Sequence, residues 1–86
     1  MANIASQEKR ILRTEREREE NRRYTSQVKT SFRRLRDAVE AGEPERVETE
    51  QRLLASRVDK AVRSGALHRN SGARKKARAA RLAAGD

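Results

Sequence analysis

Few side chains of this 86-residue chain could support catalysis. Cysteine is absent and His68 is the only histidine, so the sequence holds neither a disulfide framework nor a cysteine or multi-histidine metal site. No carboxylate or nucleophile stands at a spacing from His68 that suggests acid–base or covalent chemistry. The four glycines are isolated, so no glycine-rich phosphate loop is present. We therefore expect no enzymatic activity, no cofactor and no bound metal.

Basic residues are the chemically active class that remains. The chain has 22 Lys and Arg residues against 13 Asp and Glu, a formal net charge of +9. Residues 1–41 carry 11 basic and 7 acidic side chains, residues 42–64 carry 5 of each, and residues 65–86 carry 6 basic and 1 acidic. The positive excess therefore lies in the two flanking segments, around a neutral middle. This distribution favours a polyanionic partner, most often nucleic acid.

Helical spacing would sort the basic residues of both flanks into rows. At about 100° per residue, Lys9, Arg13, Arg16 and Arg23 share a sector of about 80°, although Glu20 falls within it. Long cations at one-turn intervals suit contact with successive phosphates. The C-terminal flank has a similar row, made of Arg74, Arg78 and Arg81 with Lys75 and Lys76 on its sides.

The two aromatic residues, Tyr24 and Phe32, both belong to an apolar stripe and are expected in the core. No aromatic platform is therefore left for stacking bases, which disfavours the common single-strand readers. The basic rows favour recognition of the backbone and shape of folded nucleic acid. His68 has two open interpretations: it caps a helix through the local backbone, or it contacts RNA together with Arg69 and Asn70.

The elements that must hold these rows are helices. Gly42-Glu43-Pro44 ends one helix and begins another, since glycine adopts the left-handed conformation after a helix and proline suits the first helical turn. Ser64-Gly65 ends the second helix, and Asn70 either caps the third or lies in its opening turn. No run alternates as a strand would. The predicted helices span about 6–41, about 44–64 and about 69–84.

Apolar stripes at helical spacing indicate which faces of the helices meet. The first stripe is made of Tyr24, Val28, Phe32, Leu35 and Val39, and the second of Val47, Leu54, Val58, Ala61 and Val62. In the third helix we expect close approach to the neighbours through a small-residue face of Ala73, Ala77, Ala80 and Ala84. Short loops make neighbouring helices antiparallel. The sequence therefore predicts an all-α three-helix bundle, forming a single domain over residues 1–86.

The first stripe stops at Tyr24, and no apolar residue lies between Leu12 and Tyr24. A coiled coil would need apolar residues there. Ion pairs at i,i+4 spacing can support an exposed helix by roughly 0.2–0.5 kcal/mol each. The available pairs are Arg13 with Glu17, Arg16 with Glu20 and Glu19 with Arg23. We therefore expect the first half of the long first helix to project from the bundle as a basic arm, with residues 1–22 partly frayed until they bind RNA.

The order and spacing of these features resemble the bacterial small-subunit ribosomal protein S-twenty family over nearly the whole chain. The most specific segment is Gly65-Ala-Leu-His-Arg-Asn70, followed by Ala73-Arg-Lys-Lys-Ala-Arg78. Shorter matches are the opening Met1-Ala-Asn-Ile-Ala-Ser-Gln7, Lys9-Arg10, Asn21, Ser26, Lys29-Thr30, Ala41-Gly42 and Asp59-Lys60-Ala61. The resemblance implies a long first helix packed with two shorter ones, direct binding to small-subunit ribosomal RNA early in subunit assembly, and no catalysis.

Candidate RNA-contact residues come from the resemblance and from the basic rows. The resemblance implies Asn3, Ser6, Lys9, Arg10, Asn21, Ser26, Lys29, His68, Arg69, Asn70, Arg74, Lys76 and Arg78. The rows add Arg13, Arg16, Arg23, Lys75 and Arg81.

The expected partners are small-subunit ribosomal RNA and neighbouring ribosomal components, at the cytoplasmic ribosome. No apolar run is long enough to span a membrane, and neither a small-molecule substrate nor self-association is expected. Two alternatives remain open. One is a nucleoid-type DNA-binding helical protein, and the other is a helical scaffold that pairs with an acidic protein through the arm.

Overall fold

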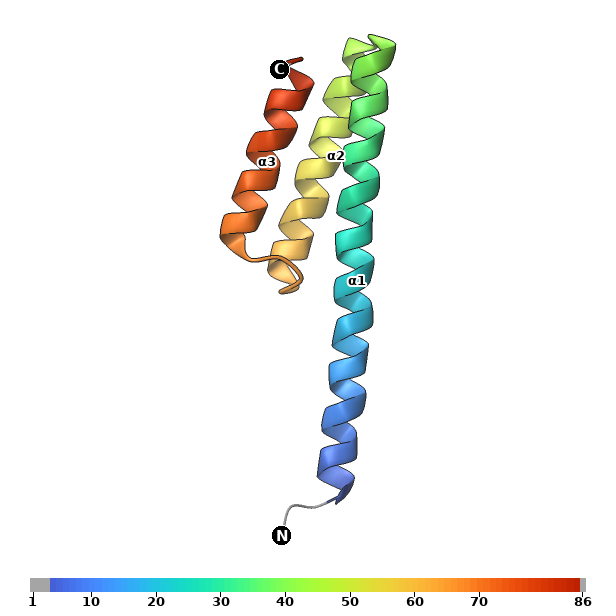
Figure 1. The fold of residues 1–86 in the computed structure, drawn as a ribbon, viewed down its shortest axis with the longest axis vertical. Helices are drawn as coiled ribbons and strands as arrows, with labels where there is room; N and C mark the ends of the chain where they lie inside the picture. The colour runs from blue at the N-terminus through green and yellow to red at the C-terminus, as the bar shows by residue number, and fades with distance from the viewer. Residues whose placement is uncertain (1–3, 86) are drawn as a thin grey trace.

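The computed structural model describes residues 4–85 as three helices and their connections (Figure 1). Helix α1 spans Ile4–Ala41, α2 spans Pro44–Arg63 and α3 spans Arg69–Ala83. No strand occurs in the described range. The all-α architecture is confirmed, and the predicted helix bounds differ from those observed by at most two residues.

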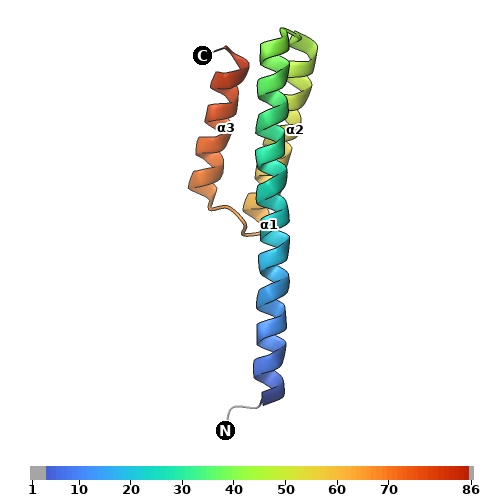
Figure 2. The same ribbon diagram turned by 45° about the vertical axis from the view of Figure 1, so that its right-hand side comes forward.

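The three helices share only half the length of α1. Helix α2 runs back along the C-terminal half of α1, and α3 turns again to run in the same direction as α1 (Figures 1 and 2). Helix α3 lies mainly against α2 and touches α1 less. The described chain measures 62 × 21 × 14 Å, and its radius of gyration is 17.2 Å. A compact chain of this length would have a radius of gyration near ~12 Å, so the molecule is strongly elongated.

Both interhelical connections use the turn residues expected from the sequence. Gly42 (φ 67°) and Gly65 (φ 85°) adopt the left-handed conformation just after α1 and α2. In each case backbone N–H groups return to carbonyls of the last helical turn; after α2 they include Gly65 N to Val62 O at 3.1 Å and Ala66 N to Ala61 O at 2.9 Å. This pattern satisfies carbonyls that a helix end would otherwise leave unpaired.

The core lies between α1 and α2, with α3 closing one side. The buried apolar residues are Val28, Leu35, Ala38, Leu54, Val58, Ala61 and Ala79. The half-buried residues Tyr24, Phe32, Val39, Val47 and Val62 pack around them. The stripes predicted for the first two helices are therefore confirmed. Ser31 is a buried polar residue that the stripes did not include, and its Oγ has no hydrogen-bond partner.

The face predicted for α3 is wrong. Ala73, Ala77, Ala80 and Ala84 are all exposed, whereas Gly72 and Ala79 are buried. A Cβ added at Gly72 would lie 2.6 Å from Val62 Cγ2, so glycine is what lets α3 approach α2 here. Leu82 lies on the same side of α3 as Gly72 and Ala79 and is half-buried. Burying part of a leucine side chain stabilises the fold more than burying another alanine would, because more apolar area leaves the water.

The first half of α1 forms the predicted arm. Every residue from 4 to 20 is exposed, and Asn21 is the first half-buried position of the chain as described. Of the three ion pairs considered for this segment, the structure joins Arg13 to Glu17, with Arg13 Nε and Glu17 Oε1 3.4 Å apart. Within residues 4–85, no helix has both the length and the apolar character needed to cross a bilayer.

Candidate nucleic-acid interface

A basic groove runs between α1 and α3, which lie side by side and point the same way (Figure 2). Three adjoining hollows line it, and Arg78 contributes to all three. No Asp or Glu lines any of them. The cations that surround these hollows, which we call the α1–α3 groove, are Lys29, Arg36, Arg74, Lys75, Arg78 and Arg81.

Arg78 is held in this groove by an aromatic ring. Its guanidinium carbon lies 5.2 Å from the centroid of the Phe32 ring, within cation–π range. Phe32 itself packs against the core, so the ring is a fixed support for the cation. A guanidinium that stacks on a ring through its face still has N–H groups at its edge, and these can donate in pairs to a phosphate. The groove therefore presents an oriented arginine near Lys29 and Lys75.

A second basic hollow lies where the end of α2 meets α1. Arg23, Lys60 and Arg63 line it together with Tyr24, and one carboxylate, Glu20, is also present. Arg57 connects the same two helices, because its Nη1 donates to the carbonyl oxygen of Gln27 at 3.4 Å. This hollow lies between the α1–α3 groove and the arm along the length of α1, so positive charge continues from the bundle towards the arm.

Lys60 and Arg63 were not predicted as contacts from the sequence, because the second helix is neutral as a whole. Residues 43–51 carry four acidic side chains and one basic, whereas residues 52–63 carry four basic and one acidic. The positive half of α2 faces the arm, and the negative half lies at the opposite end of the bundle (Figure 1). Dividing the helix in two would have revealed this polarity from sequence.

Arg36 was also missed, although a signal for it exists. It lies seven residues after Lys29, so both occupy the same edge of the α1 stripe, beside Phe32. In the structure Arg36 lines one hollow with Arg78 and Arg81, and Lys29 lines another with Lys75 and Arg78.

The predicted contact residues fall into three places. The α1–α3 groove collects Lys29, Arg74, Lys75, Arg78 and Arg81. The exposed arm carries Ser6, Lys9, Arg10, Arg13 and Arg16. Nearer the bundle on α1 lie Asn21, Arg23 and Ser26, of which Asn21 is half-buried and the other two are exposed. Asn3 lies outside the described residues.

Lys76 is not a member of the groove. Its Nζ pairs with Asp59 Oδ1 on α2 at 2.9 Å. Lys76 lies about 160° around α3 from Arg78, so the two side chains leave the helix on nearly opposite sides. The structure therefore corrects the row predicted from sequence: Lys75 stands beside it, and Lys76 joins α3 to α2.

His68 caps α3. Its Nδ1 accepts a hydrogen bond from the Asn70 backbone N–H at 3.1 Å, and its backbone is extended, as an N-cap requires. Of the two interpretations of His68, this geometry supports the cap. Arg69 is the first residue of α3 and Asn70 the second, so Asn70 lies in the opening turn and is not the cap. All three side chains are exposed at the end of α3 nearer the arm.

Comparison with known proteins gives this interface a family context. The chain matches the family described as Ribosomal protein S20 over residues 2–84. It is 47% identical over 81 residues to the Small ribosomal subunit protein bS20 of Frankia casuarinae, covering 94% of this chain and 91% of that protein. It is 40% identical over 85 residues to the protein of the same name from Beutenbergia cavernae, covering 99% of each chain.

These matches confirm the family resemblance found in the sequence. They also agree with the predictions of a non-enzymatic protein and of a place at the cytoplasmic ribosome, because this is a family of ribosomal structural proteins and not of enzymes. The family match over residues 2–84 includes all three helices. The chain belongs to the ribosomal protein S20 family.

Proposed function

We propose that the protein is a structural constituent of the small ribosomal subunit that binds small-subunit ribosomal RNA directly and helps its assembly. The observation that carries this proposal is the α1–α3 groove, in which six cations surround three hollows with no carboxylate in their lining. Such a groove attracts phosphates, and binding there releases the counterions condensed on the nucleic acid. Family membership favours ribosomal RNA over other polyanions.

Contact with RNA occurs through phosphates and shape. The groove has long cations but no free aromatic ring, since Phe32 is already covered by Arg78. Contacts from arginine and lysine to phosphate fix position without reading bases. The protein therefore selects an RNA fold whose backbone follows the groove.

The arm extends this contact to a second place. Seventeen exposed residues, 4–20, give a helix of about 25 Å beyond the bundle. Cations on the arm and in the groove would bind two separate RNA segments, and the bundle would set their spacing. A protein that binds only the folded arrangement stabilises it by mass action, which is how it helps assembly.

The groove is tested by removing two of its cations. We expect the Arg78→Ala/Arg81→Ala variant to bind small-subunit ribosomal RNA at least tenfold more weakly than the original chain, in a filter-binding assay at fixed salt. Its matched control is Arg46→Ala/Arg52→Ala, which loses the same charge from exposed positions of α2. Equal affinity of these two variants would contradict the proposal. Circular dichroism checks that both remain helical.

A competition experiment distinguishes RNA binding from the DNA-binding alternative. Duplex DNA should fail to displace labelled small-subunit ribosomal RNA at equal nucleotide concentration and salt. Displacement by duplex DNA as efficient as by unlabelled ribosomal RNA would favour a general nucleic-acid binder.

A further inference from the structure

A groove of different chemistry lies at the end of the bundle opposite the arm, where α1 ends, α2 begins and α3 ends (Figure 1). Its volume is about 520 Å³, within the range of about 300–1,000 Å³ typical of ligand pockets. We call it the bundle-end groove. Its lining is Val39, Gly42, Glu43, Pro44, Val47, Glu48, Gln51, Ala80, Ala83 and Ala84.

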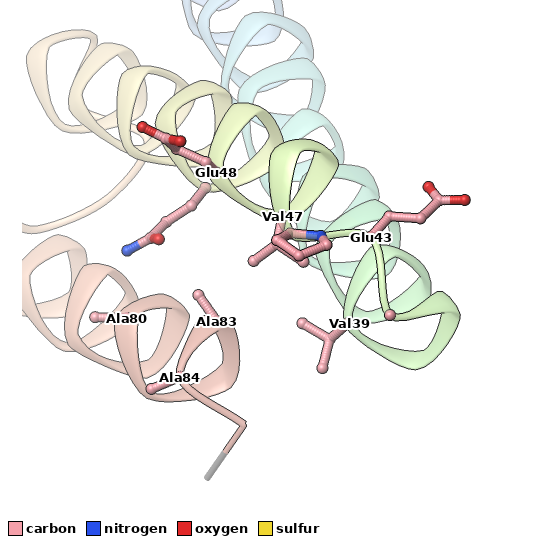
Figure 3. A pocket seen from close by; sticks show the side chains of 10 residues that line it. Val39, Glu43, Val47, Glu48, Ala80, Ala83 and Ala84 are labelled. Carbon is pink, nitrogen blue, oxygen red and sulfur yellow. The ribbon is translucent and has the colours of Figure 1, made fainter.

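The floor of the bundle-end groove is apolar. Val39 of α1, Val47 of α2 and Ala83 of α3 point into the same space, and Ala80 and Ala84 continue it along α3 (Figure 3). The valines and Ala83 are only half-buried, although they pack against the core. An aliphatic side chain placed on this floor would remove their remaining apolar surface from water, which is favourable.

The rim of the groove is acidic. The carboxylates of Glu43 and Glu48 stand around the floor and point away from it (Figure 3). Each pairs with an arginine of α2, Glu43 with Arg46 at 3.4 Å and Glu48 with Arg52 at 2.6 Å. These pairs are exposed, and exposed pairs contribute little, so either carboxylate can exchange its partner for another cation.

Two further features make this end of the bundle negative. The last turn of α1 contains no basic residue, and the partial positive charge at the start of α2 beside it is offset by Glu45 in the first turn of α2. No Lys or Arg lines the bundle-end groove, whereas each of the four hollows described above is lined by at least two. A nucleic-acid phosphate would therefore be repelled from this groove.

We propose that the bundle-end groove receives a basic segment of another protein, in which an arginine or lysine stands beside one or two aliphatic residues. The aliphatic side chains would cover the valine and alanine floor, and the cation would bind the Glu43 or Glu48 carboxylate. The groove and the RNA contacts occupy different sides of α3, since Ala80 and Ala84 line the former while Arg78 and Arg81 line the latter. The protein can therefore hold both partners at once, and this proposal does not rest on the RNA contact.

The test is an NMR titration of the isotope-labelled full chain with two blocked nine-residue probe peptides. The basic probe alternates arginine and leucine, and the control probe replaces each arginine by glutamate. We expect the basic probe to shift the amides of Val47, Ala80 and Ala84 in a saturable way, and the acidic probe to leave them unchanged. No saturable shift up to millimolar basic probe, or equal binding of both probes, would overturn the proposal.

Charge variants then test the rim. Glu43→Gln/Glu48→Gln should lower the affinity for the basic probe by roughly three- to tenfold, in line with the loss of two exposed charge contacts. The control Glu15→Gln/Glu19→Gln loses the same charge from the exposed arm and should bind the probe as the original chain does. Equal weakening in both variants would assign the binding to overall charge and refute the site. A second change, Ala84→Trp at an exposed groove position, should block the probe without disturbing the core.

Other occupants give distinct outcomes. Concentration-dependent shifts of the groove amides without any probe would identify a second copy of this chain. Groove shifts on adding small-subunit ribosomal RNA alone would identify RNA, and both results overturn the proposal. RNA that shifts only Phe32, Arg78 and their neighbours agrees with it. Failure of RNA binding would remove the proposed function and leave the peptide result standing.

Discussion

Arg78 and Lys76 show that the position of a basic side chain depends on the residue it packs against. Arg78 lines all three hollows of the α1–α3 groove, stacks on Phe32 and lies opposite Lys76, two residues away, which instead ties α3 to Asp59. Both residues are exposed cations on one short helix. Their different partners give them different tasks, one towards a ligand and one within the fold.

Replacing Phe32 by leucine should weaken RNA binding without unfolding the protein. Leucine keeps an apolar side chain beside the core but removes the ring under Arg78, and a cation–π contact at an exposed site is worth about 0.5–1 kcal/mol. We expect an affinity loss of about two- to fivefold, with the salt dependence unchanged because no charge is lost. Phe32→Tyr keeps the ring and serves as the control. A leucine variant with full affinity would show that the ring does not orient Arg78.

Replacing Gly72 by alanine should destabilise the protein. In Gly72→Ala the new Cβ would meet Val62 Cγ2 at 2.6 Å, and valine is too stiff to move aside easily. Overpacking of this kind costs about 1–3 kcal/mol, against a helix-propensity gain of up to about 1 kcal/mol. Urea denaturation should therefore show a net loss of stability.

The control for Gly72 is Ala77→Gly, at an exposed position of the same helix. That variant reports the intrinsic cost of glycine in α3 where nothing packs against it. Gly72→Ala/Val62→Ala should recover part of the lost stability, since the clash is with that valine. A Gly72→Ala variant more stable than the original would disprove the close approach.

At the scale of elements, the arm and the bundle differ in what holds them helical. The arm has exposed side chains throughout, including Ile4, Ile11 and Leu12, and its Arg13–Glu17 pair is fully at the surface. Exposed i,i+4 pairs contribute only about 0.2–0.5 kcal/mol each. The other half of α1 buries Val28, Leu35 and Ala38 against α2.

Amide hydrogen exchange should detect this difference. In the free protein we expect residues 4–20 to exchange fast and residues 28–38 to exchange slowly, because local stability follows buried contacts. Addition of small-subunit ribosomal RNA should slow exchange in the arm. Equal protection of both halves of α1 in the free protein would contradict partial fraying.

The element bounds could be read from the sequence because single residues mark them. Gly42, Pro44 and Gly65 have backbone preferences that act locally, so their effect does not depend on tertiary structure. The face of α3 could not be read in the same way. Alanine is nearly indifferent to burial, so a sector of alanines does not decide orientation, whereas Gly72 decides it only once Val62 stands opposite.

At the scale of the whole molecule, the net positive charge lies in the bundle, since residues 4–20 carry five basic and five acidic side chains. Spacing alone predicted four of the cations that line the α1–α3 groove, Arg74, Lys75, Arg78 and Arg81, because α3 is a regular helix. Lys60 and Arg63 join them only because α2 packs antiparallel to α1 and brings its basic half beside Arg23. Lys76 lies outside the α1–α3 groove because it pairs with Asp59 across the helix interface. The pairing of Lys76 with Asp59 is tertiary and has no signal within one helix, whereas the basic half of α2 is visible when that helix is divided in two.

The salt dependence of RNA binding should report the number of cations engaged. If the six groove cations and a few arm cations neutralise about six to ten phosphates, affinity should fall by about 10³–10⁵ between 50 and 200 mM salt. Removing Lys9, Arg13 and Arg16 together should reduce the slope of log K against log salt by about 2–3. A slope unchanged by that variant would exclude the arm from the interface.

The straight, unsupported arm also acts as a lever. Its tip stands about 25 Å from the nearest bundle contact, so a 10° error in how the bundle is seated would displace the tip by about 4 Å, more than the length of a hydrogen bond. Under the proposed function, the arm would become a straight helix only when bound, and its tip would reach its RNA contacts only where the bundle is seated accurately. Folding of the arm on RNA would then depend on RNA that already surrounds the bundle in its correct shape.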